Sequence, residues 1–514
     1  MKTILQLCAL VLATPVFGMN LTFDVSQLGS STLNATNVYV TFAGATSDMI
    51  YDPNGTAETI NFSGNNLVIG NATYGTSKAY SLQDINTNGL RINSAQSITG
   101  YISYGSTMGI SQLAANLQPS PFTTSTARWS NFEFTYTGGN TGGADLTNIS
   151  QFGGSLRMDL LEGNTSQAHV KNTLNTGDTF RALAATSGNQ SATTISSSGN
   201  FVRVLGANVW PASVNATTVE NPYPSFEPYL QHLTNTFGSN SSSTLTNLVT
   251  GQAPGGSGAV GTTSTANATS VTANASYNLD YHFGSVTVNG TGGNGSSVTL
   301  SGYVNATPTT GGNTTVYNSL SITVDGDNYA TMLSMTNFLY QQTIDAPTLV
   351  GVTLSGWSDL INDFGAGFVS GGLQQKVAGD FSEGILMGLV GSTTTFGNAT
   401  LGSLTSKDWF TTANDFTGSV AQPINQFYSL WGNVVNGNSN GFNGGNFTRG
   451  GVYGSPFDDR FALNTISPNA NTTGLKITLL ADGDLAVIPE PTSVALLISA
   501  LAFCLLVRKR FTAS

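Results

Sequence analysis

Charged side chains are scarce in this sequence. Its 514 residues include 16 Lys and Arg against 27 Asp and Glu, and charged residues make up 8% of the chain, where about a quarter is usual. So few basic residues, with a formal net charge of −11, exclude a protein that binds nucleic acid through a basic surface. Apolar residues make up 39% of the chain, which is enough to fill a sizeable core, so we expect a globular protein.

Cysteine and histidine are almost as rare. The two cysteines, Cys8 and Cys504, lie in apolar segments near the chain ends, so the body between them has no disulfide, no cysteine metal site and no thiol nucleophile. The three histidines, His169, His232 and His282, lie far apart and have none of the spacings that metal ligands show. We therefore predict neither a metal site nor a cofactor.

The N-terminus predicts export. Lys2 precedes an apolar run at residues 4–13 and small residues up to Gly18, which is the pattern of a secretory signal peptide. The apolar run is too short to span a bilayer. Residues 1–18 are therefore predicted to be a signal peptide that is removed.

The C-terminal segment, residues 486–514, has two interpretations. An apolar run at residues 493–507 is followed by Arg508, Lys509 and Arg510, a pattern that fits a permanent membrane anchor with its basic end in the cytoplasm. The Pro-Glu-Pro directly before that run resembles the bacterial PEP-CTERM sorting signal, which implies cleavage by an exosortase-type protease. We favour sorting, so residues 19 to about 485 are expected outside the cell or in its envelope. Membrane contact is then made only through the C-terminal helix before processing.

The body of the chain begins and ends in strand patterns. Apolar and polar residues alternate at residues 38–42, 97–104, 132–136 and 201–205, which predicts antiparallel strands with one buried face. Residues 19–205 are therefore interpreted as the first part of a β domain, and residues 446–485 as its return strands.

The middle of the chain, residues 206–445, is predicted to be a mixed α/β insertion. Strand patterns at 284–289, 298–304 and 319–324 are followed by helical windows at 329–342, 360–389 and 409–435. Residues 251–276 are rich in Gly, Ser, Thr and Ala and have too few bulky side chains to pack a core, which predicts a flexible segment. The predicted fold class is thus mainly β, closed by both chain ends, with an inserted α/β domain.

A pair of carboxylates is the remaining candidate for hydrolytic chemistry, because cysteine and histidine chemistry is unsupported. Two carboxylates are the usual machinery for glycosidic bonds: one protonates the leaving oxygen, and the other activates water or attacks. Glu133 lies between Phe132 and Phe134 in a strand pattern, so it points away from both rings and faces solvent or a cleft if the rings fill the core. On spacing alone, a solvated strand glutamate is the alternative.

Several segments resemble one family of enzymes. F-E-F-T at residues 132–135, followed by L-T-N-I-S-Q-F-G-G-S-L-R-M at 146–158, is similar to the paired segment of glycoside hydrolase family 64 β-1,3-glucanases and the wider thaumatin-like superfamily. Further short matches lie at residues 102–105, 226–230 and 452–459. The resemblance implies a thaumatin-like β-sandwich or barrel beside a mixed α/β insertion, with a wide groove between them that holds β-1,3-glucan.

The resemblance also implies roles for single residues. Glu133 matches the general acid of an inverting hydrolysis, but Ser150 occupies the position of the aspartate base, and an unassisted hydroxyl is a weak base at neutral pH. Asp145, reaching the cleft from a loop, is the candidate for a second carboxylate.

Other positions are candidate substrate contacts. Thr135 lies two residues along the strand from Glu133, and therefore on the same face, so its hydroxyl is a candidate to bind a sugar hydroxyl. Asp458 and Asp459 match the closing motif, where they contribute to an acidic groove or serve as turn residues.

Three functional hypotheses follow. The first is an exported β-1,3-glucanase-like protein that acts on or binds β-1,3-glucan or a related polysaccharide. The second is a non-catalytic carbohydrate-binding or extracellular-matrix protein that has lost the base. The third is a β-rich envelope protein whose short matches are coincidental. A second carboxylate close to Glu133 favours the first hypothesis over the second.

Overall fold

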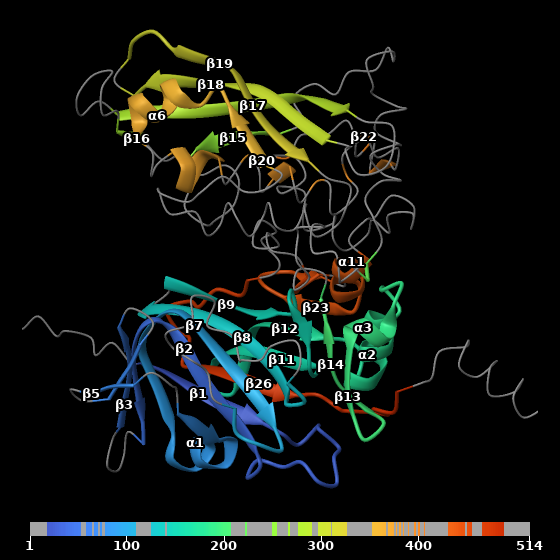
Figure 1. The fold of residues 1–514 in the computed structure, drawn as a ribbon. Helices are drawn as coiled ribbons and strands as arrows, with labels where there is room; N and C mark the ends of the chain where they lie inside the picture. Colours follow the sequence, from blue (N-terminus) through green and yellow to red (C-terminus); the bar gives the residue numbers. More distant parts are fainter. Residues whose placement is uncertain are drawn as a thin grey trace, which may run out of the picture.

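Two β-sheets form most of the part of the chain that the computed structural model describes (Figure 1). The described residues are 18–52, 58–63, 66–69, 72–74, 78–108, 125–138, 141–206, 222–223, 249–253, 266–267, 276–289, 297–309, 311–325, 352–365, 369–374, 377, 380–381, 384, 389, 395–396, 399–400, 406, 430–447, 450–454 and 465–487. Nearly all of the predicted signal peptide and of the C-terminal sorting segment lies outside these residues. Of the predicted flexible segment, residues 251–253, 266–267 and 276 are described and belong to strands, which corrects the prediction there, and the rest lies outside. Among the described residues, no helix combines the length and the apolar character needed to cross a bilayer.

The large sheet contains fifteen strands. They are β1 (Met19–Asp24), β2 (Val38–Tyr51), β3 (Glu58–Ser63), β4 (Asn66–Ile69), β5 (Ala72–Tyr74), β6 (Ala79–Ser81), β7 (Leu90–Tyr104), β8 (Arg128–Gly138), β9 (Thr141–Thr147), β11 (Leu156–Glu162), β12 (Thr165–Asn172), β23 (Ser439–Phe442), β24 (Asn446–Phe447), β25 (Val452–Tyr453) and β26 (Gly474–Leu479). The prediction of a mainly β protein is confirmed, and three of the four predicted N-terminal strand segments lie in β2, β7 and β8.

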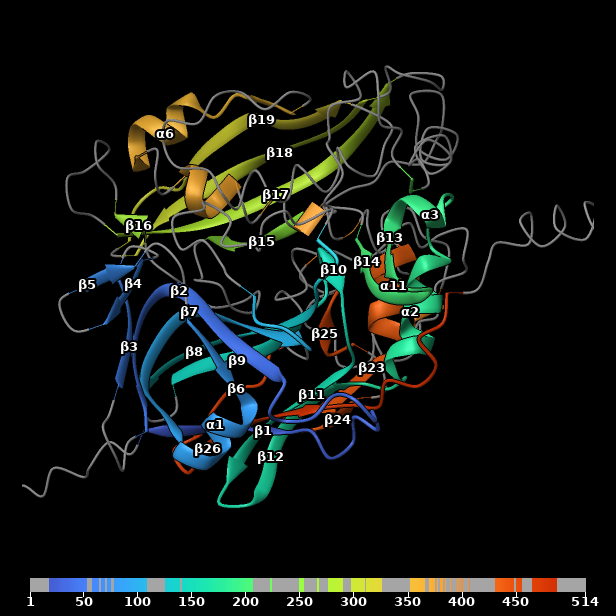
Figure 2. The same cartoon turned by 60° about the horizontal axis from the view of Figure 1, so that its bottom comes forward.

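The large sheet divides at β7 into two arms. One edge of β7 pairs along its whole length with β2, whereas on the other edge its first residues pair with β1 and the rest pair with β8. One arm continues from β8 through β9 to β25, and the other runs from β1 through β26, β11, β12 and β23 to β24. β1 and β26 are parallel neighbours, so the first and last described strands lie side by side. The sheet curls into a half-barrel (Figure 2).

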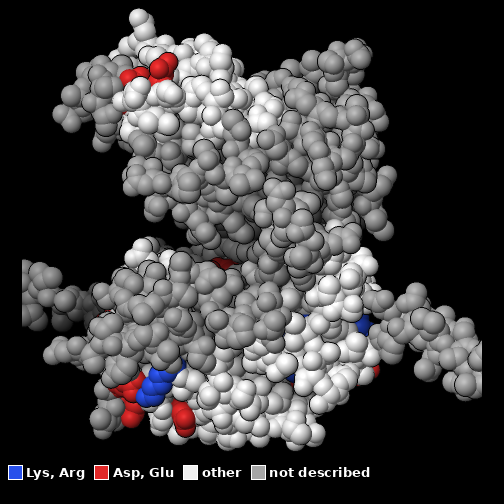
Figure 3. Space-filling model, viewed as in Figure 1, with Lys and Arg blue, Asp and Glu red and all other residues white. Residues whose placement is uncertain are grey.

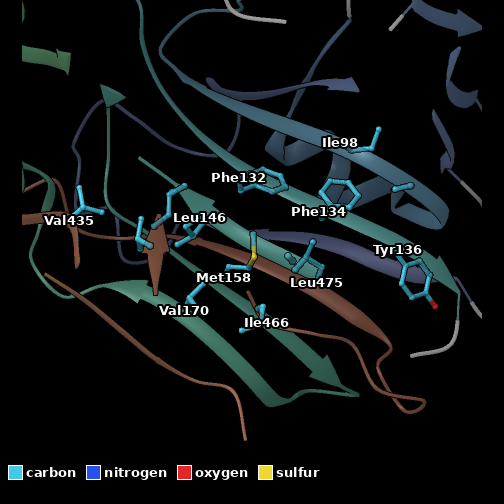
Figure 4. Packing of buried hydrophobic residues seen from close by; sticks show 14 of the residues in the cluster. Ile98, Phe132, Phe134, Tyr136, Leu146, Met158, Val170, Val435, Ile466 and Leu475 are labelled. Atoms are coloured by element: carbon cyan, nitrogen blue, oxygen red, sulfur yellow. The ribbon is translucent and has the colours of Figure 1, made fainter. Parts of the chain in front are cut away.

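The core lies between the two arms. Phe132 and Phe134 of β8 and Leu146 of β9 point inward from one arm toward Met158 of β11 and Leu475 of β26 on the other (Figure 4). All five side chains are buried. Alternating apolar residues on each strand produce this packing because side chains alternate between the two faces of a strand. The face of β8 and β9 that points away from the core is therefore available for polar residues.

Short helices and a small sheet cover one end of the half-barrel. The sheet contains β10 (Gln151–Phe152), β13 (Thr194–Ser197) and β14 (Asn200–Leu205), the last of which covers the fourth predicted strand segment. The helices at this end are α2 (Thr176–Ala184), α3 (Gln190–Thr193) and α11 (Leu430–Gly437) (Figure 1). Helix α1 (Leu82–Asn88) lies elsewhere and contacts β1, β2 and β6. Phe180 of α2 stacks on Phe201 of β14, with ring centroids 5.3 Å apart, so α2 is fixed by its apolar face.

A second sheet, of six strands, lies within the predicted insertion. It contains β15 (Val249–Ala253), β16 (Ala266–Asn267), β17 (Ser276–Asn289), β18 (Ser297–Pro308), β19 (Thr315–Asp325) and β20 (Val352–Ser355). The three strand patterns predicted between residues 284 and 324 fall in β17, β18 and β19. Helix α6 (Ser358–Phe364) follows β20, and the ring of Trp357 before it stacks on Phe283 at 5.7 Å. A π-helix, η2 (Val369–Gln374), and the short strands β21 (Thr395–Phe396) and β22 (Ala399–Thr400) come next.

A buried ion pair ties β8 to the C-terminal segment. The guanidinium of Arg128 donates to both carboxylate oxygens of Asp482, with Nη1 2.9 Å from Oδ2, and its Nε donates to the carbonyl of Gly153 at 2.7 Å. The two side chains are only 9% and 11% exposed. Loss of one partner would leave the other charge buried without compensation, which is costly.

We expect Asp482→Leu to lower the free energy of unfolding by about 3–5 kcal/mol, measured by urea denaturation, because Arg128 would lose its counter-charge in a buried site. Asp484→Leu is the matched control: its side chain is 72% exposed and its ion pair with Arg181 is long, at 3.9 Å. The control is expected to change stability by no more than about 0.5 kcal/mol. Equal effects from the two variants would contradict a structural role for the Arg128–Asp482 pair.

Candidate active site

Glu133 lies on the face of β8 that points away from the core. Its neighbours Phe132 and Phe134 are 0% and 2% exposed and fill the core, whereas Glu133 is half-buried. This is the orientation that the alternation in the sequence predicts. Asn131 and Thr135 are also half-buried and share this face, because alternate residues of a strand point the same way.

Asp145 lies directly beside Glu133. In the antiparallel ladder between β8 and β9, Glu133 is paired with Asp145, and on the other side of β8 it is paired with Thr99 of β7. Residues that face each other across such a ladder project from the same side of the sheet, with Cβ atoms about 4.5–5.5 Å apart. The structure therefore brings two carboxylates together on one polar face.

The position of Asp145 corrects one expectation. The sequence predicts a loop position for Asp145, but the residue lies inside β9, where Ala144 and Leu146 on either side are buried in the core. The hairpin before it is tight: a Cβ atom on Gly142 would lie 2.1 Å from the carbonyl oxygen of Thr135. The glycines let the chain reverse and rejoin the ladder, so Asp145 comes from a strand.

Hydroxyl groups extend the polar face around the carboxylates. Thr147 Oγ1 donates to Asp145 Oδ1 at 2.9 Å, which fixes the orientation of that carboxylate. Thr147 is paired in turn with Tyr453 of β25, whose hydroxyl lies 2.6 Å from Thr465 Oγ1. On the other side, the backbone N–H of Ser97 donates to Thr135 Oγ1 at 3.1 Å. These contacts hold the side chains of the face in fixed positions.

The remaining predicted residues lie elsewhere. Ser150 follows the end of β9 by three residues, outside the ladder that holds Glu133, and its carbonyl accepts a hydrogen bond from the N–H of Gly206 at 2.8 Å. Asp458 and Asp459 lie outside the described residues. Among the described residues, no group of three or more His, Cys, Asp or Glu side chains gathers as a metal site.

Burial changes the acidity of Glu133. Loss of water around its carboxyl group raises the pKa of Glu133 to about 6, because the charged form is disfavoured there. Such a pKa suits a general acid, which must carry a proton near the working pH. The described residues on the face shown in Figure 3 include few charged side chains, and one small acidic spot lies recessed beside the large sheet.

Sequence reasoning missed several residues of this face. They lie on β8, which carries Glu133, and on its neighbours β7 and β9, and they are Thr99, Tyr101, Asn131 and Thr147. Asn131, Glu133 and Thr135 form a period-two polar row opposite an apolar row, and this pattern was visible in the sequence. The partners on β7 and β9 needed the strand register, which the sequence does not contain.

Among the comparisons with known proteins, the comparison with solved structures found similarities and the other two did not. No family model matches the chain, and no curated protein matches it significantly. The chain is similar to a β-1,3-glucanase domain of glycoside hydrolase family 64 from Clostridium beijerinckii, with a TM-score of 0.47 and 12% identity over 90% of this chain and 98% of that one. It is also similar to the family 64 laminaripentaose-producing β-1,3-glucanase from Paenibacillus barengoltzii. One structure of that protein gives a TM-score of 0.24 and 16% identity, and its complex with laminarihexaose gives 0.24 and 15%. Each of these two matches covers 33% of this chain and 43% of the other. Because identity is this low, a catalytic assignment has to rest on the chain's own residues.

Proposed function

We propose that this protein is a glycoside hydrolase in which Glu133 is the general acid and Asp145 is the second carboxylate. The observation that carries the proposal is the direct pairing of Glu133 with Asp145 on one polar face of the β8–β9 hairpin. Most enzymes that hydrolyse glycosidic bonds use two such groups. The raised pKa of Glu133 supports its role as the proton donor.

The proposed reaction is an inverting hydrolysis. Glu133 donates its proton to the glycosidic oxygen as the bond to the anomeric carbon breaks, and Asp145 takes a proton from the water that attacks from the opposite side. Inversion needs carboxyl groups about 6.5–9.5 Å apart, so that a water fits between them. The Cβ atoms of directly paired residues lie about 4.5–5.5 Å apart, so the side chains of Glu133 and Asp145 have to diverge to reach that separation.

The proposed substrate is β-1,3-glucan or a related polysaccharide. This part of the proposal rests on the similarity of residues 132–135 and 146–158 to the paired segment of family 64 enzymes of the thaumatin-like superfamily. Thr135 is proposed to contact sugar hydroxyls, since its Oγ1 accepts from Ser97 and its own O–H is left to donate. Asp458 and Asp459 are proposed to contribute to the substrate groove.

A second candidate function is carbohydrate binding without hydrolysis. The observation that favours it is Ser150, which stands where the family resemblance expects the base. A hydroxyl does not replace a carboxylate as a base. If Asp145 does not take over, the same face would bind a polysaccharide without cleaving it, as a matrix protein does.

We also propose that the protein is exported and sorted. The N-terminal signal pattern and the Pro-Glu-Pro, apolar and basic segments of residues 489–510 support secretion followed by exosortase-type cleavage. Mass spectrometry of the mature C-terminus tests this, and a retained basic tail would contradict it.

The functional proposal is tested by incubating the full chain with linear β-1,3-glucan and measuring the release of reducing sugar, with β-1,4-glucan as the control polymer. A pull-down on insoluble β-1,3-glucan is run in parallel. We expect release from the β-1,3-linked polymer. Binding without release would favour the second function, and neither binding nor release would contradict both.

A further inference from the structure

A small apolar cluster lies on the same face of the sheet as Glu133. Ala43 of β2, Tyr101 of β7, Trp129 of β8 and Met108 are all buried and pack together, separately from the main core. Trp129 is four residues before Glu133 on β8, so the two share a face. Thr41 of β2 donates to the carbonyl of Met108 at 3.2 Å and so holds that segment over the sheet. The polar face therefore has an apolar wall beside it.

Tyr101 is the member of this cluster that lies nearest to Glu133 in the strand register. In the β7–β8 ladder Tyr101 is paired with Asn131, and Thr99 is paired with Glu133, so Tyr101 and Glu133 are diagonal neighbours on one face. Diagonal neighbours are about 7–8 Å apart, within reach of an aromatic side chain. Tyr101 is 7% exposed. Its buried ring is therefore within reach of one side of the Glu133 carboxyl group.

The two groups also interact electrically. Burial, and in addition the charge of Glu133, raise the pKa of the Tyr101 phenol above its usual range. Among the described titratable groups, Tyr101 of β7 and Asp145 of β9 face Glu133 from its two neighbouring strands. Tyr101 is neutral at the pH where Glu133 titrates, whereas Asp145 is a second carboxyl group. The effects of the two neighbours can therefore be separated by substitution.

We propose that Tyr101 is a positioning residue for Glu133: its ring shields one side of the Glu133 carboxyl group from water and so keeps the group protonated for catalysis. The ring, and not the hydroxyl, carries this role, because a neutral hydroxyl stabilises a nearby carboxylate and would favour loss of the proton. The proposal rests on the proposed function only in naming Glu133 as the acid.

The test measures the titration of Glu133 by NMR in the full chain labelled with carboxyl-¹³C glutamate. The chain has only seven glutamates, and the signal that is missing in Glu133→Gln assigns Glu133. We expect a midpoint near pH 6 in the unchanged chain. Tyr101→Ser is expected to lower the midpoint by about one pH unit, because water enters beside the carboxyl group. Tyr101→Phe is expected to raise the midpoint or to change it by no more than about 0.3 pH units.

Two further variants keep the test decisive. Tyr39→Ser is the matched control: Tyr39 is a half-buried tyrosine of β2, and Ser103 of β7 lies between it and β8. It is expected to leave the titration of Glu133 unchanged. If Tyr101→Ser fails to fold, Tyr101→Gln preserves most of the side-chain length and is expected to lower the midpoint in the same direction.

An unchanged midpoint in Tyr101→Ser or Tyr101→Gln overturns the proposal, and so does an equal fall in Tyr101→Phe. The NMR titration does not need activity, so its outcome is independent of whether the chain hydrolyses glucan. If hydrolysis is present, the alkaline limb of the pH profile of kcat should move by the same amount as the midpoint. If the chain hydrolyses glucan but the midpoint does not move in the Tyr101 variants, only the role of Tyr101 is overturned. If the midpoint moves but the chain does not hydrolyse glucan, only the proposed function is contradicted.

Discussion

Glu133→Gln is expected to lower kcat on linear β-1,3-glucan by about 10²–10⁴-fold, the usual contribution of a general acid. Glutamine keeps the shape of the side chain and its hydrogen-bonding capacity, but it cannot give a proton to the leaving oxygen. Binding of the polymer is expected to stay close to that of the unchanged chain, because the face around residue 133 keeps its other side chains. Initial rates of reducing-sugar release, measured beside a glucan pull-down, check both expectations.

The same variant separates loss of chemistry from loss of folding. The folded-state pKa of Glu133 is raised from 4.5 to about 6, so between these pH values the folded chain holds more protons than the unfolded chain. The free energy of unfolding therefore falls as the pH rises through this window, and Glu133→Gln removes that fall. We expect the variant to be more stable than the unchanged chain at pH 7, by up to about 2 kcal/mol, and equally stable near pH 4.

The pH profile of the unchanged chain follows from the same group. Because the acid must be protonated, kcat is expected to decline as the pH rises through about 6. A variant Glu133→Gln that is both inactive and less stable at pH 7 would contradict the assignment, since damage to the fold would then explain the loss. Full activity in Glu133→Gln would also contradict it.

Asp145→Asn is expected to lower kcat by about 10²–10⁴-fold as well. The amide cannot take a proton from the attacking water, whereas the carboxylate held by Thr147 at 2.9 Å can. Asp145 lies opposite Glu133 in the ladder, so it is the described carboxylate best placed to complete the pair. The measurement is the initial rate on the same polymer, at the optimum pH of the unchanged chain.

Asp84→Asn is the control for this substitution, because Asp84 is an exposed carboxylate in the first turn of α1. It is expected to leave kcat unchanged. Thr147→Val is expected to have an intermediate effect, of about 10-fold, because Asp145 would keep its charge and lose a contact that orients it. Activity in Asp145→Asn equal to that of the control would show that the base lies elsewhere.

Local patterns in the sequence predicted part of the strands and the orientation of Glu133. Phe132, Phe134 and Tyr136 alternate with polar residues, and this alternation settles which side of β8 faces the core once the segment is a strand. Strands β17, β18 and β19 of the second sheet were predicted for the same reason, whereas β15, β16 and β20 were not. Helices α1 and α2 were missed because they are short, although Ser81 and Asn175 cap them in the way that such residues often do.

Contacts between distant segments could not be predicted in this way. The pairing of Glu133 with Asp145 depends on the hairpin at Gly142, which leaves Ala144 and Leu146 in the core. The ion pair of Arg128 with Asp482 joins residues 354 positions apart. Strand register and long-range pairing arise from packing of the whole sheet, and alternation along one segment contains no information about them.

The most direct test of the account is a double-mutant cycle on hydrolysis of linear β-1,3-glucan, with the unchanged chain, Glu133→Gln, Asp145→Asn and the double variant. When two groups act together in one step, removal of either group removes most of their joint contribution to the rate. We therefore expect the double variant to be about as slow as the slower single variant. Losses that multiply in the double variant, or an unchanged rate in either single variant, would contradict the claim that Glu133 and Asp145 work as a pair.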